Sequence, residues 1–152
     1  MKEQNYKNWK VVQSVELGAT AKQVWDIVGG FYTIHKWHPD ITDTEVITDQ
    51  TDTRQIRRLL TFPEQPQGIE ELVSIDNENY HYSYKWYWGE WGEKIHKYRS
   101  DLRVFDTKEG NSVLQWKATF FYKEDAISEF YQRGFDKLLK LFPMIKESAD
   151  VI

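Results

Sequence analysis

The sequence predicts an α+β fold in which a curved antiparallel sheet of about seven strands wraps around a long C-terminal helix. Between residues 42 and 122, apolar and polar residues alternate in short runs separated by turns, which is typical of antiparallel strands. Residues 125–142 then place apolar side chains at helical spacing. A chain of 152 residues is long enough to bury one core, so we expect a single domain over residues 1–152.

The first predicted elements are a strand and two short helices. Residues 9–17 alternate apolar and polar side chains, which predicts a half-buried strand. Thr20 and Gln23 have the spacing of a capping box, and apolar residues follow at helical spacing up to Val28, before a pair of glycines. A second short helical turn is expected over residues 31–36, just before a Trp-His-Pro segment that breaks it.

Six further strands are expected before the last helix. In chain order they cover residues 42–48, 54–62, 67–76, 79–88, 95–105 and 112–122. The segments between them are short and rich in turn-forming residues, which favours a meander over crossover connections. Asp125 can cap the final helix, whose apolar residues form one stripe up to Phe142, and Pro143 should end or kink it.

The densest aromatic pattern lies on the strand 79–88. Alternate positions are occupied by Tyr80, Tyr82, Tyr84, Trp86 and Trp88. Since successive side chains of a strand point to opposite faces, all five rings should project from one face. Such a face must pack against a helix, line a cavity or meet a partner.

Composition narrows the classes of function. The chain has 20 Lys and Arg residues against 24 Asp and Glu, with no basic stripe, so no nucleic-acid partner is expected. No stretch approaches the roughly 18 apolar residues of a membrane helix, so no membrane insertion is expected. There is no cysteine for a disulfide or a thiol nucleophile, and no phosphate-binding loop, so we expect no cofactor. Residues 1–10 are polar and unlike a secretory signal, which predicts a cytoplasmic protein.

The order of elements and several residues resemble a known superfamily. These residues are 21–28 with Trp37 and Pro39, then Glu71, Leu72 and Asp76, then Tyr84, Tyr98 and 116–120. The chain resembles the START-like (SRPBCC) superfamily, which contains polyketide cyclase/dehydrase-like proteins, the Bet v 1 pollen allergens and the plant abscisic acid receptors. The resemblance runs from residue 11 to about 142. It implies the helix-grip (Bet v 1-like) fold and contains no catalytic motif.

A register argument predicts a row of polar residues on the apolar face. If the turns on both sides of the strand 67–76 contain four residues, Arg58 lies opposite Glu71, and Glu71 lies opposite Tyr84. Extending the row to the next strand adds Ser100. A buried charged pair is costly unless it is paired and hydrogen-bonded, so the row is either a structural ion pair or a ligand anchor. As an anchor, Arg58 would pair with an anionic group, and Glu71 would orient the ligand or accept a hydroxyl proton.

Rings near one end of the sheet are expected to surround a mouth. They are Phe62, Trp86, Trp88, Tyr98, Phe120 and Tyr122, with His96 beside them. Each ring alone is explained by core packing, but one helix cannot cover every ring on so wide a sheet. Gly134 lies on the inward stripe of the last helix, where it indicates either open space or close contact with Trp116.

The histidines do not predict a metal centre. His35, His38 and Asp40 have loosely ligand-like spacing, but Trp37 and Pro39 between them favour a packed turn, so we expect no metal. Neither Ser14 nor Ser100 has an evident neighbouring base, which argues against a hydrolase triad.

These patterns predict a protein that binds a small hydrophobic molecule, aromatic or polycyclic, in a cavity between the sheet and the last helix. The expected ligand-binding residues are Arg58, Phe62, Glu71, Tyr84, Trp86, Tyr98, Ser100, Trp116, Phe120 and Gly134. The alternative is an enzyme resembling polyketide cyclases or dehydrases, in which Glu71, Tyr84 or His96 moves protons in the same cavity. A protein-interaction module with an exposed aromatic face is a third interpretation.

Overall fold

The computed structural model describes residues 7–47, 56–63, 66–89, 95–122 and 127–141. The elements are β1 Lys7–Leu17, α1 Ala21–Val28, η1 Ile34–Lys36, β2 Asp43–Ile47, β3 Arg57–Thr61, β4 Gly68–Asp76, β5 His81–Gly89, β6 His96–Asp106, β7 Ser112–Tyr122 and α3 Ile127–Leu141. The predicted fold class is confirmed: a strand and two short helical segments precede six strands and a long helix.

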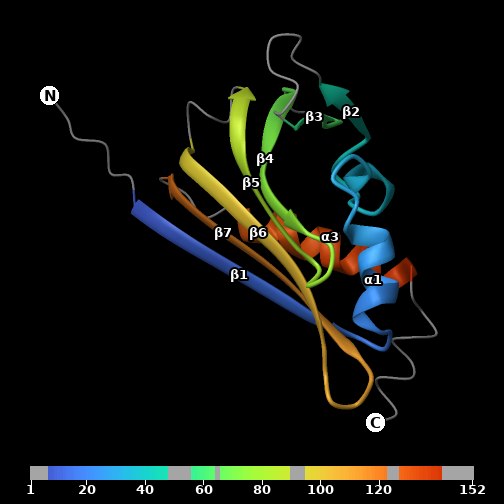
Figure 1. Ribbon diagram of the computed structural model, residues 1–152. Helices are drawn as coiled ribbons and strands as arrows, with labels where there is room; N and C mark the ends of the chain where they lie inside the picture. Colours follow the sequence, from blue (N-terminus) through green and yellow to red (C-terminus); the bar gives the residue numbers. More distant parts are fainter. Residues whose placement is uncertain (1–6, 48–55, 64–65, 90–94, 123–126, 142–152) are drawn as a thin grey trace, which may run out of the picture.

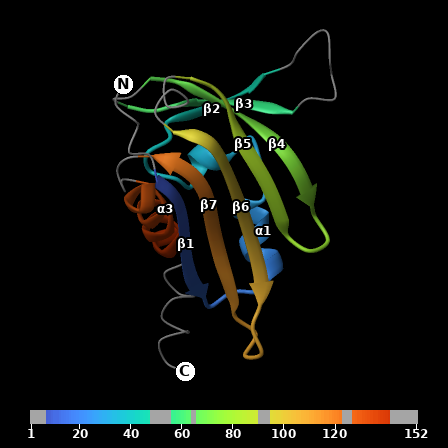
Figure 2. The same cartoon turned by 90° about the vertical axis from the view of Figure 1, so that its left-hand side faces the viewer.

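The seven strands form one antiparallel sheet in the order β1-β7-β6-β5-β4-β3-β2. The strands from β2 to β7 follow one another as a meander, and β1 pairs with β7 along its whole length. The sheet is curved, and both helices lie on the same side of it (Figures 1 and 2). Helix α3 packs against β1, while α1 packs against β6 and β7.

Helix α1 begins as the sequence predicts. The Thr20 side chain accepts a hydrogen bond from the backbone N–H of Gln23 at 3.2 Å, and the Gln23 side chain accepts one from the backbone N–H of Thr20 at 3.0 Å. Both groups of the capping box are thus satisfied. The backbone N–H of Ala21 also donates to the Asp106 carboxylate at 2.8 Å, which ties the start of α1 to the end of β6.

The core lies between the sheet and the two helices. Strand β7 shows the alternation clearly, because Leu114, Trp116, Ala118 and Phe120 are all buried while the residues between them are not. Helix α3 is amphipathic and buries Tyr131, Phe135 and Leu138. In the part of the chain that the structure describes, no helix combines the length and the apolar character that crossing a bilayer requires.

The predicted register between β3 and β4 is wrong by one residue. Arg58 pairs with Glu70, and its neighbour Arg57 pairs with Glu71. Because a shift of one residue exchanges the two faces of a strand, Glu71 lies on the outer face and not in the predicted inner row. There it accepts a hydrogen bond from Nε of Arg57 at 2.8 Å and lies 3.5 Å from Nζ of Lys85.

Two irregularities in the β4–β5 pairing lie on either side of the segment that pairs with Tyr84. One lies between Ile69 and Glu70, and the other lies between Leu72 and Ser74. Between them Tyr84 pairs with Leu72, which lies on the same face of β4 as Glu70, so Tyr84 is on the inner face, where it is buried. The predicted pairing of Tyr84 with Ser100 on the next strand is confirmed.

The aromatic ladder is shorter than predicted. Its middle rings, Tyr82, Tyr84 and Trp86, face inward from β5, and Tyr80 packs against Trp25 of α1. Tyr80 precedes β5 and has a φ of 56°, so it belongs to the turn. Trp88 pairs with Ile69 on the outer face, and 59% of its surface is exposed. The expectation that all five rings share one face, and that Trp88 stands at an inner mouth, is therefore wrong.

His96 also lies away from its predicted place. The β6–β7 pairing is irregular between His96 and Arg99, and the intervening Lys97 has a φ of 56°. As a result His96 pairs with Phe121 and is exposed, while the neighbouring Phe120 is buried on the inner face.

Candidate functional site

The charged pair on the inner face consists of Arg58 and Glu70. Nε and Nη2 of Arg58 donate to the same carboxylate oxygen, Oε1 of Glu70, at 2.9 and 2.6 Å. Nη1 donates to the backbone oxygen of Phe31 at 2.8 Å. The guanidinium carbon lies 4.1 Å from the centre of the Phe31 ring and 4.7 Å from that of Tyr84. The protein therefore holds Arg58 both by hydrogen bonds and by contacts with two aromatic rings.

Burial and mutual attraction oppose each other in this pair. Burial by itself lowers the pKa of Arg58, but the charge of Glu70, the neighbouring Tyr82 and Tyr84 and the hydrogen bond to Glu70 together outweigh burial, so that the pKa is raised. Burial raises the pKa of Glu70, and the charge and hydrogen bonds of Arg58 oppose that rise. Because a guanidinium does not lose its proton in proteins and donates two hydrogen bonds to the carboxylate, we take the folded pair as ionised.

A chain of hydrogen bonds continues along the inner face. Nε1 of Trp116 donates to the Tyr84 hydroxyl at 2.9 Å and to the Ser100 hydroxyl at 3.0 Å. The Ser100 hydroxyl donates to a backbone oxygen of β7 and lies 3.3 Å from the hydroxyl of Tyr131, which in turn lies 2.5 Å from that of Tyr98. Burial is the largest cause that raises the pKa of all three tyrosines well above 10, so they remain protonated.

Nine of the ten predicted ligand-binding residues lie on the inner face of the sheet or, in the case of Gly134, on the part of α3 that packs against it. They are Arg58, Phe62, Tyr84, Trp86, Tyr98, Ser100, Trp116, Phe120 and Gly134. Phe62, Trp86 and Tyr98 keep part of their surface accessible, whereas the others are buried. The tenth, Glu71, lies on the opposite face, and so does the exposed catalytic candidate His96.

Gly134 marks close contact and not open space. A Cβ atom at this position would lie 2.7 Å from Cδ2 of His38 and 3.3 Å from Cζ3 of Trp116. His38 is fully buried, and its Nδ1 accepts a hydrogen bond from the backbone N–H of Asp40 at 3.1 Å. Asp40 forms an ion pair with Arg133 of α3. The turn after η1 is thus wedged between α3 and the sheet.

Comparison with known families decides the affiliation. A family model described as polyketide cyclase / dehydrase and lipid transport matches residues 8–142. The chain belongs to this family. The match covers the sheet and α3, and it confirms the START-like resemblance that the sequence indicates. A comparison with curated proteins gave no match.

Solved structures support the same fold for this family member. The protein XoxI from Bacillus cereus has a TM-score of 0.75 at 24% identity, over 88% of this chain and 94% of that one. A putative uncharacterized protein from Bacillus thuringiensis has a TM-score of 0.75 at 23% identity, over 88% and 98% of the two chains. Ginseng major latex-like protein 151 from Panax ginseng reaches 0.69 at 14% identity, over 89% and 97%. At these identities the likeness shows the fold alone.

Sequence reasoning missed Glu70, although a signal for it is present in this member of the polyketide cyclase/dehydrase and lipid transport family. Two arginines are adjacent on β3 and two glutamates are adjacent on β4. Pairing Arg58 with Glu70 also pairs Arg57 with Glu71, so both faces of the sheet gain an ion pair. The predicted register satisfies only one of the two arginines. Charge complementarity counted on both faces would therefore have favoured the observed register.

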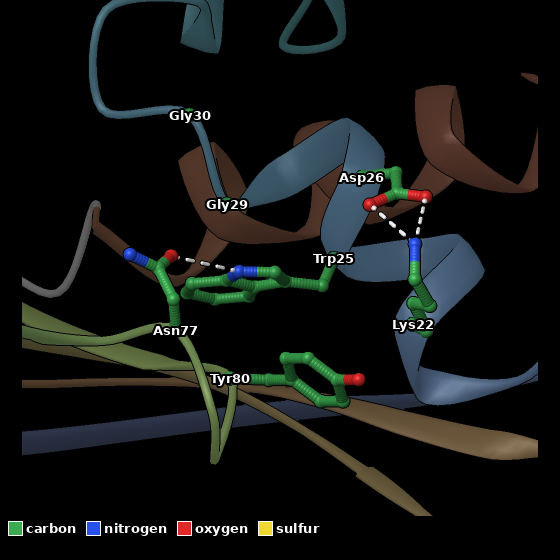
Figure 3. Close-up of a pocket in the computed structure, with 7 residues that line it drawn as sticks. All are labelled: Lys22, Trp25, Asp26, Gly29, Gly30, Asn77 and Tyr80. Carbon is green, nitrogen blue, oxygen red and sulfur yellow. Dashed lines mark hydrogen bonds and ion pairs between the residues drawn. The ribbon is translucent and has the colours of Figure 1, made fainter.

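A surface pocket of about 470 Å³ lies apart from the inner face, between α1 and the β4–β5 turn (Figure 3). It is lined by Lys22, Trp25, Asp26, Gly29, Gly30, Asn77 and Tyr80. Nε1 of Trp25 donates to the side-chain oxygen of Asn77 at 3.1 Å. Gly29 lies over one face of the Trp25 ring and Tyr80 over the other, as Figure 3 shows. Because both faces of the ring are covered, these contacts fasten the β4–β5 turn to α1 and leave no platform for a flat ligand.

Polar residues also gather on the outer face of the sheet. A small pocket of about 120 Å³ is lined there by His81, Asp101, Arg103, Gln115 and Lys117. Ser83 and His81 both hydrogen-bond to the same oxygen of Asp101. Since Asp101 lies between the serine and the histidine, the histidine is not placed to take the serine proton, and the arrangement is not a hydrolase triad. No group of three or more metal-binding side chains gathers among the residues described.

Proposed function

We propose that this protein binds a small, largely hydrophobic molecule, aromatic or polycyclic, between the inner face of the sheet and α3. The observation that carries the proposal is a set of three half-buried rings on the inner face, Phe62, Trp86 and Tyr98, of which Trp86 pairs with Glu70 of the buried ion pair. Apolar walls with a few fixed polar groups are the usual composition of small-molecule sites. The description of the family, which names lipid transport, is consistent with such a site.

Binding would rest on the removal of apolar surface from water. Each Å² of apolar surface that is buried contributes about 25 cal/mol. Flat ligands gain further from offset stacking or edge contacts with the rings of Trp86 and Tyr98. The neighbouring tyrosines Tyr84 and Tyr98 already lie 6.5 Å apart, centroid to centroid, so a ligand ring would extend an existing aromatic cluster.

The enzyme alternative has less support in the geometry. A cyclase or dehydrase needs a group that moves protons at the ligand site. Of the residues that the sequence suggests, Glu71 is paired with Arg57 on the outer face and His96 is exposed there. Tyr84 is on the inner face, but its raised pKa makes it a poor proton donor and, at neutral pH, no base. We therefore prefer binding without turnover.

Tryptophan fluorescence tests the proposal. A panel of polyphenols, steroids and fatty acids should include compounds that change the emission, and native mass spectrometry of protein purified from its own host should show a retained small molecule. Trp86→Phe should remove a large part of the emission change, because Trp86 lies on the inner face. Trp88→Phe is the matched control on the outer face and should leave it intact.

Two results would contradict the proposal. One is the absence of binding by both methods across the panel. The other is an emission change that depends on Trp88 and not on Trp86, since that would place the ligand on the outer face of the sheet.

A further inference from the structure

The accessible surface of the buried ion pair belongs to Glu70 alone. Arg58 is 0% exposed, whereas Glu70 is 6% exposed. Both hydrogen bonds from Arg58 end on Oε1 of Glu70, and no described residue donates to Oε2. Among the residues described, some side-chain atoms are fully buried and lack a hydrogen-bond partner, such as Nε1 of Trp37, and Oε2 does not belong to that group. Oε2 therefore reaches accessible space. Trp86, the half-buried residue paired with Glu70 on the next strand, shares this part of the inner face.

Arg58 is closed to any ligand. Its Nε, Nη1 and Nη2 atoms all donate to protein oxygens, and the side chain is fully buried. The rings of Phe31 and Tyr84 also lie against the guanidinium, with their centres 4.1 and 4.7 Å from its carbon. An anionic ligand would have to displace Glu70 to reach Arg58. It would also approach the unpaired oxygen of a carboxylate, where like charges repel.

We infer that the ligand of this site carries a neutral hydroxyl group, phenolic or alcoholic, that donates a hydrogen bond to Oε2 of Glu70. The inference rests on the proposed function, because it assigns the polar end of the molecule that the inner face would bind. A carboxylate oxygen that is already held by an arginine on its other side is a strong and fixed acceptor. Glu70 is then the specificity-determining residue, and Arg58 positions it.

The same geometry excludes the anionic anchor that the sequence suggests for Arg58. A carboxylate on the ligand could not donate a proton to Oε2 at neutral pH, and its charge would be desolvated beside another negative charge. A phenol has a pKa near 10 and stays neutral, so it can donate. The site should therefore prefer ligands that carry a hydrogen-bond donor, and a negative charge on the ligand should not improve binding.

Three probes of one ring system separate these cases. They are 2-naphthol, 2-methoxynaphthalene and 2-naphthoate, with affinities measured at pH 7 by fluorescence and calorimetry. A hydrogen bond to a charged acceptor contributes about 1.5–3 kcal/mol, which corresponds to roughly 10- to 100-fold in affinity. We expect naphthol to bind about 10-fold or more tightly than its methyl ether, which keeps the oxygen but has no proton to donate. Naphthoate should bind most weakly of the three.

Glu70→Gln should change the order of the probes. The substitution removes the negative charge and leaves the positive charge of Arg58 uncompensated, so naphthoate should gain affinity by about 10-fold while the preference for naphthol over the ether shrinks. Glu71→Gln is the matched control, because this adjacent glutamate lies on the outer face and should leave the order unchanged.

The outcomes distinguish the inference from the function on which it rests. If none of the probes binds and the wider panel also fails, the proposed function is wrong. If the probes bind but the ether equals naphthol, or naphthoate binds most tightly to the unmodified protein, binding stands and the hydroxyl inference is overturned. The order measured on the unmodified protein decides this even if Glu70→Gln does not fold.

Discussion

Trp116 of β7 and Tyr131 of α3 are stacked with their ring centroids 4.4 Å apart and their planes inclined by 30°. Both side chains are fully buried. The Tyr131 hydroxyl hydrogen-bonds with the hydroxyl groups of Tyr98 and Ser100 on β6. The Ser100 hydroxyl also accepts a hydrogen bond from Nε1 of Trp116. One residue of α3 thus joins the helix to two neighbouring strands, through its ring and through its hydroxyl.

Substitutions at Tyr131 should separate these two contributions. Tyr131→Phe keeps the stacked ring but removes the hydroxyl, so we expect the free energy of unfolding to fall by about 1–2 kcal/mol. Tyr131→Ala also removes the ring and leaves a cavity, with an expected loss of about 3–5 kcal/mol. Urea unfolding followed by circular dichroism measures both. Equal losses in the two variants would show that the ring contributes little.

Removing one charge of the Arg58–Glu70 pair should destabilise the protein more than replacing both charged residues by apolar ones. Arg58→Met leaves a buried carboxylate without its partner, and we expect a loss of about 3–5 kcal/mol in the free energy of unfolding. The double variant Arg58→Met/Glu70→Leu removes both charges and should recover most of that loss. Arg57→Met, at the partly exposed outer pair, should cost about 1 kcal/mol or less. A double variant as unstable as Arg58→Met would argue that packing, and not charge, dominates at this position.

Gly134→Ala should destabilise the protein although alanine is the better helix former. The gain in helix propensity is at most about 1 kcal/mol. The added methyl group would lie 2.7 Å from the ring of His38, which is fully buried and cannot move aside. Overpacking of this kind costs about 1–3 kcal/mol, so we expect a net loss in a thermal or urea unfolding experiment. Asp136→Ala, at an exposed position of the same helix, is the control and should change stability little.

Asp101 should contribute to acid stability. Burial raises the pKa of this carboxyl, but hydrogen bonds from Ser83 and His81, aided by the charge of Lys117, outweigh burial, so the pKa lies below the ordinary 3.8. Since the folded carboxyl binds its proton less tightly than the unfolded one, its stabilising contribution is complete above pH about 4. The contribution is lost as the pH falls through the lower, folded pKa.

Ser83→Ala tests this assignment. Removal of the hydroxyl should raise the pKa of Asp101 toward the ordinary value, which carbon-detected NMR of the side-chain carboxyl follows directly. The pKa of Asp76 is also lowered, mainly by Asn79, and should stay where it is. An unmoved Asp101 pKa would show that His81 and Lys117 suffice to keep it low.

The sequence predicted the elements well because their signals are local. The capping box at Thr20 and Gln23 and the alternation along β7 each depend on residues within a few positions of one another. The register of β4 depends instead on one residue in a turn and on two irregularities, near Ile69 and near Val73. The apolar residues of β4 do not keep one parity, so hydrophobic alternation could not fix which glutamate faces inward.

The candidate site was predicted in part for the same reason. Strand alternation was enough to place Arg58 and Tyr84 on the inner face, because each is read from its own strand. Phe31, which covers Arg58, and Tyr131, which completes the hydroxyl chain, come from segments far away in the sequence. Their contacts follow from tertiary packing, which no local pattern encodes.

The internal neutralisation of Arg58 has a consequence for how a molecule would arrive at this face. Since the cation and its counterion lie within hydrogen-bond distance of each other, their fields largely cancel a short way out. Long-range electrostatic steering would then contribute little to the rate of ligand association, and screening by dissolved salt would have little effect on it. Association and affinity should stay nearly constant as ionic strength rises.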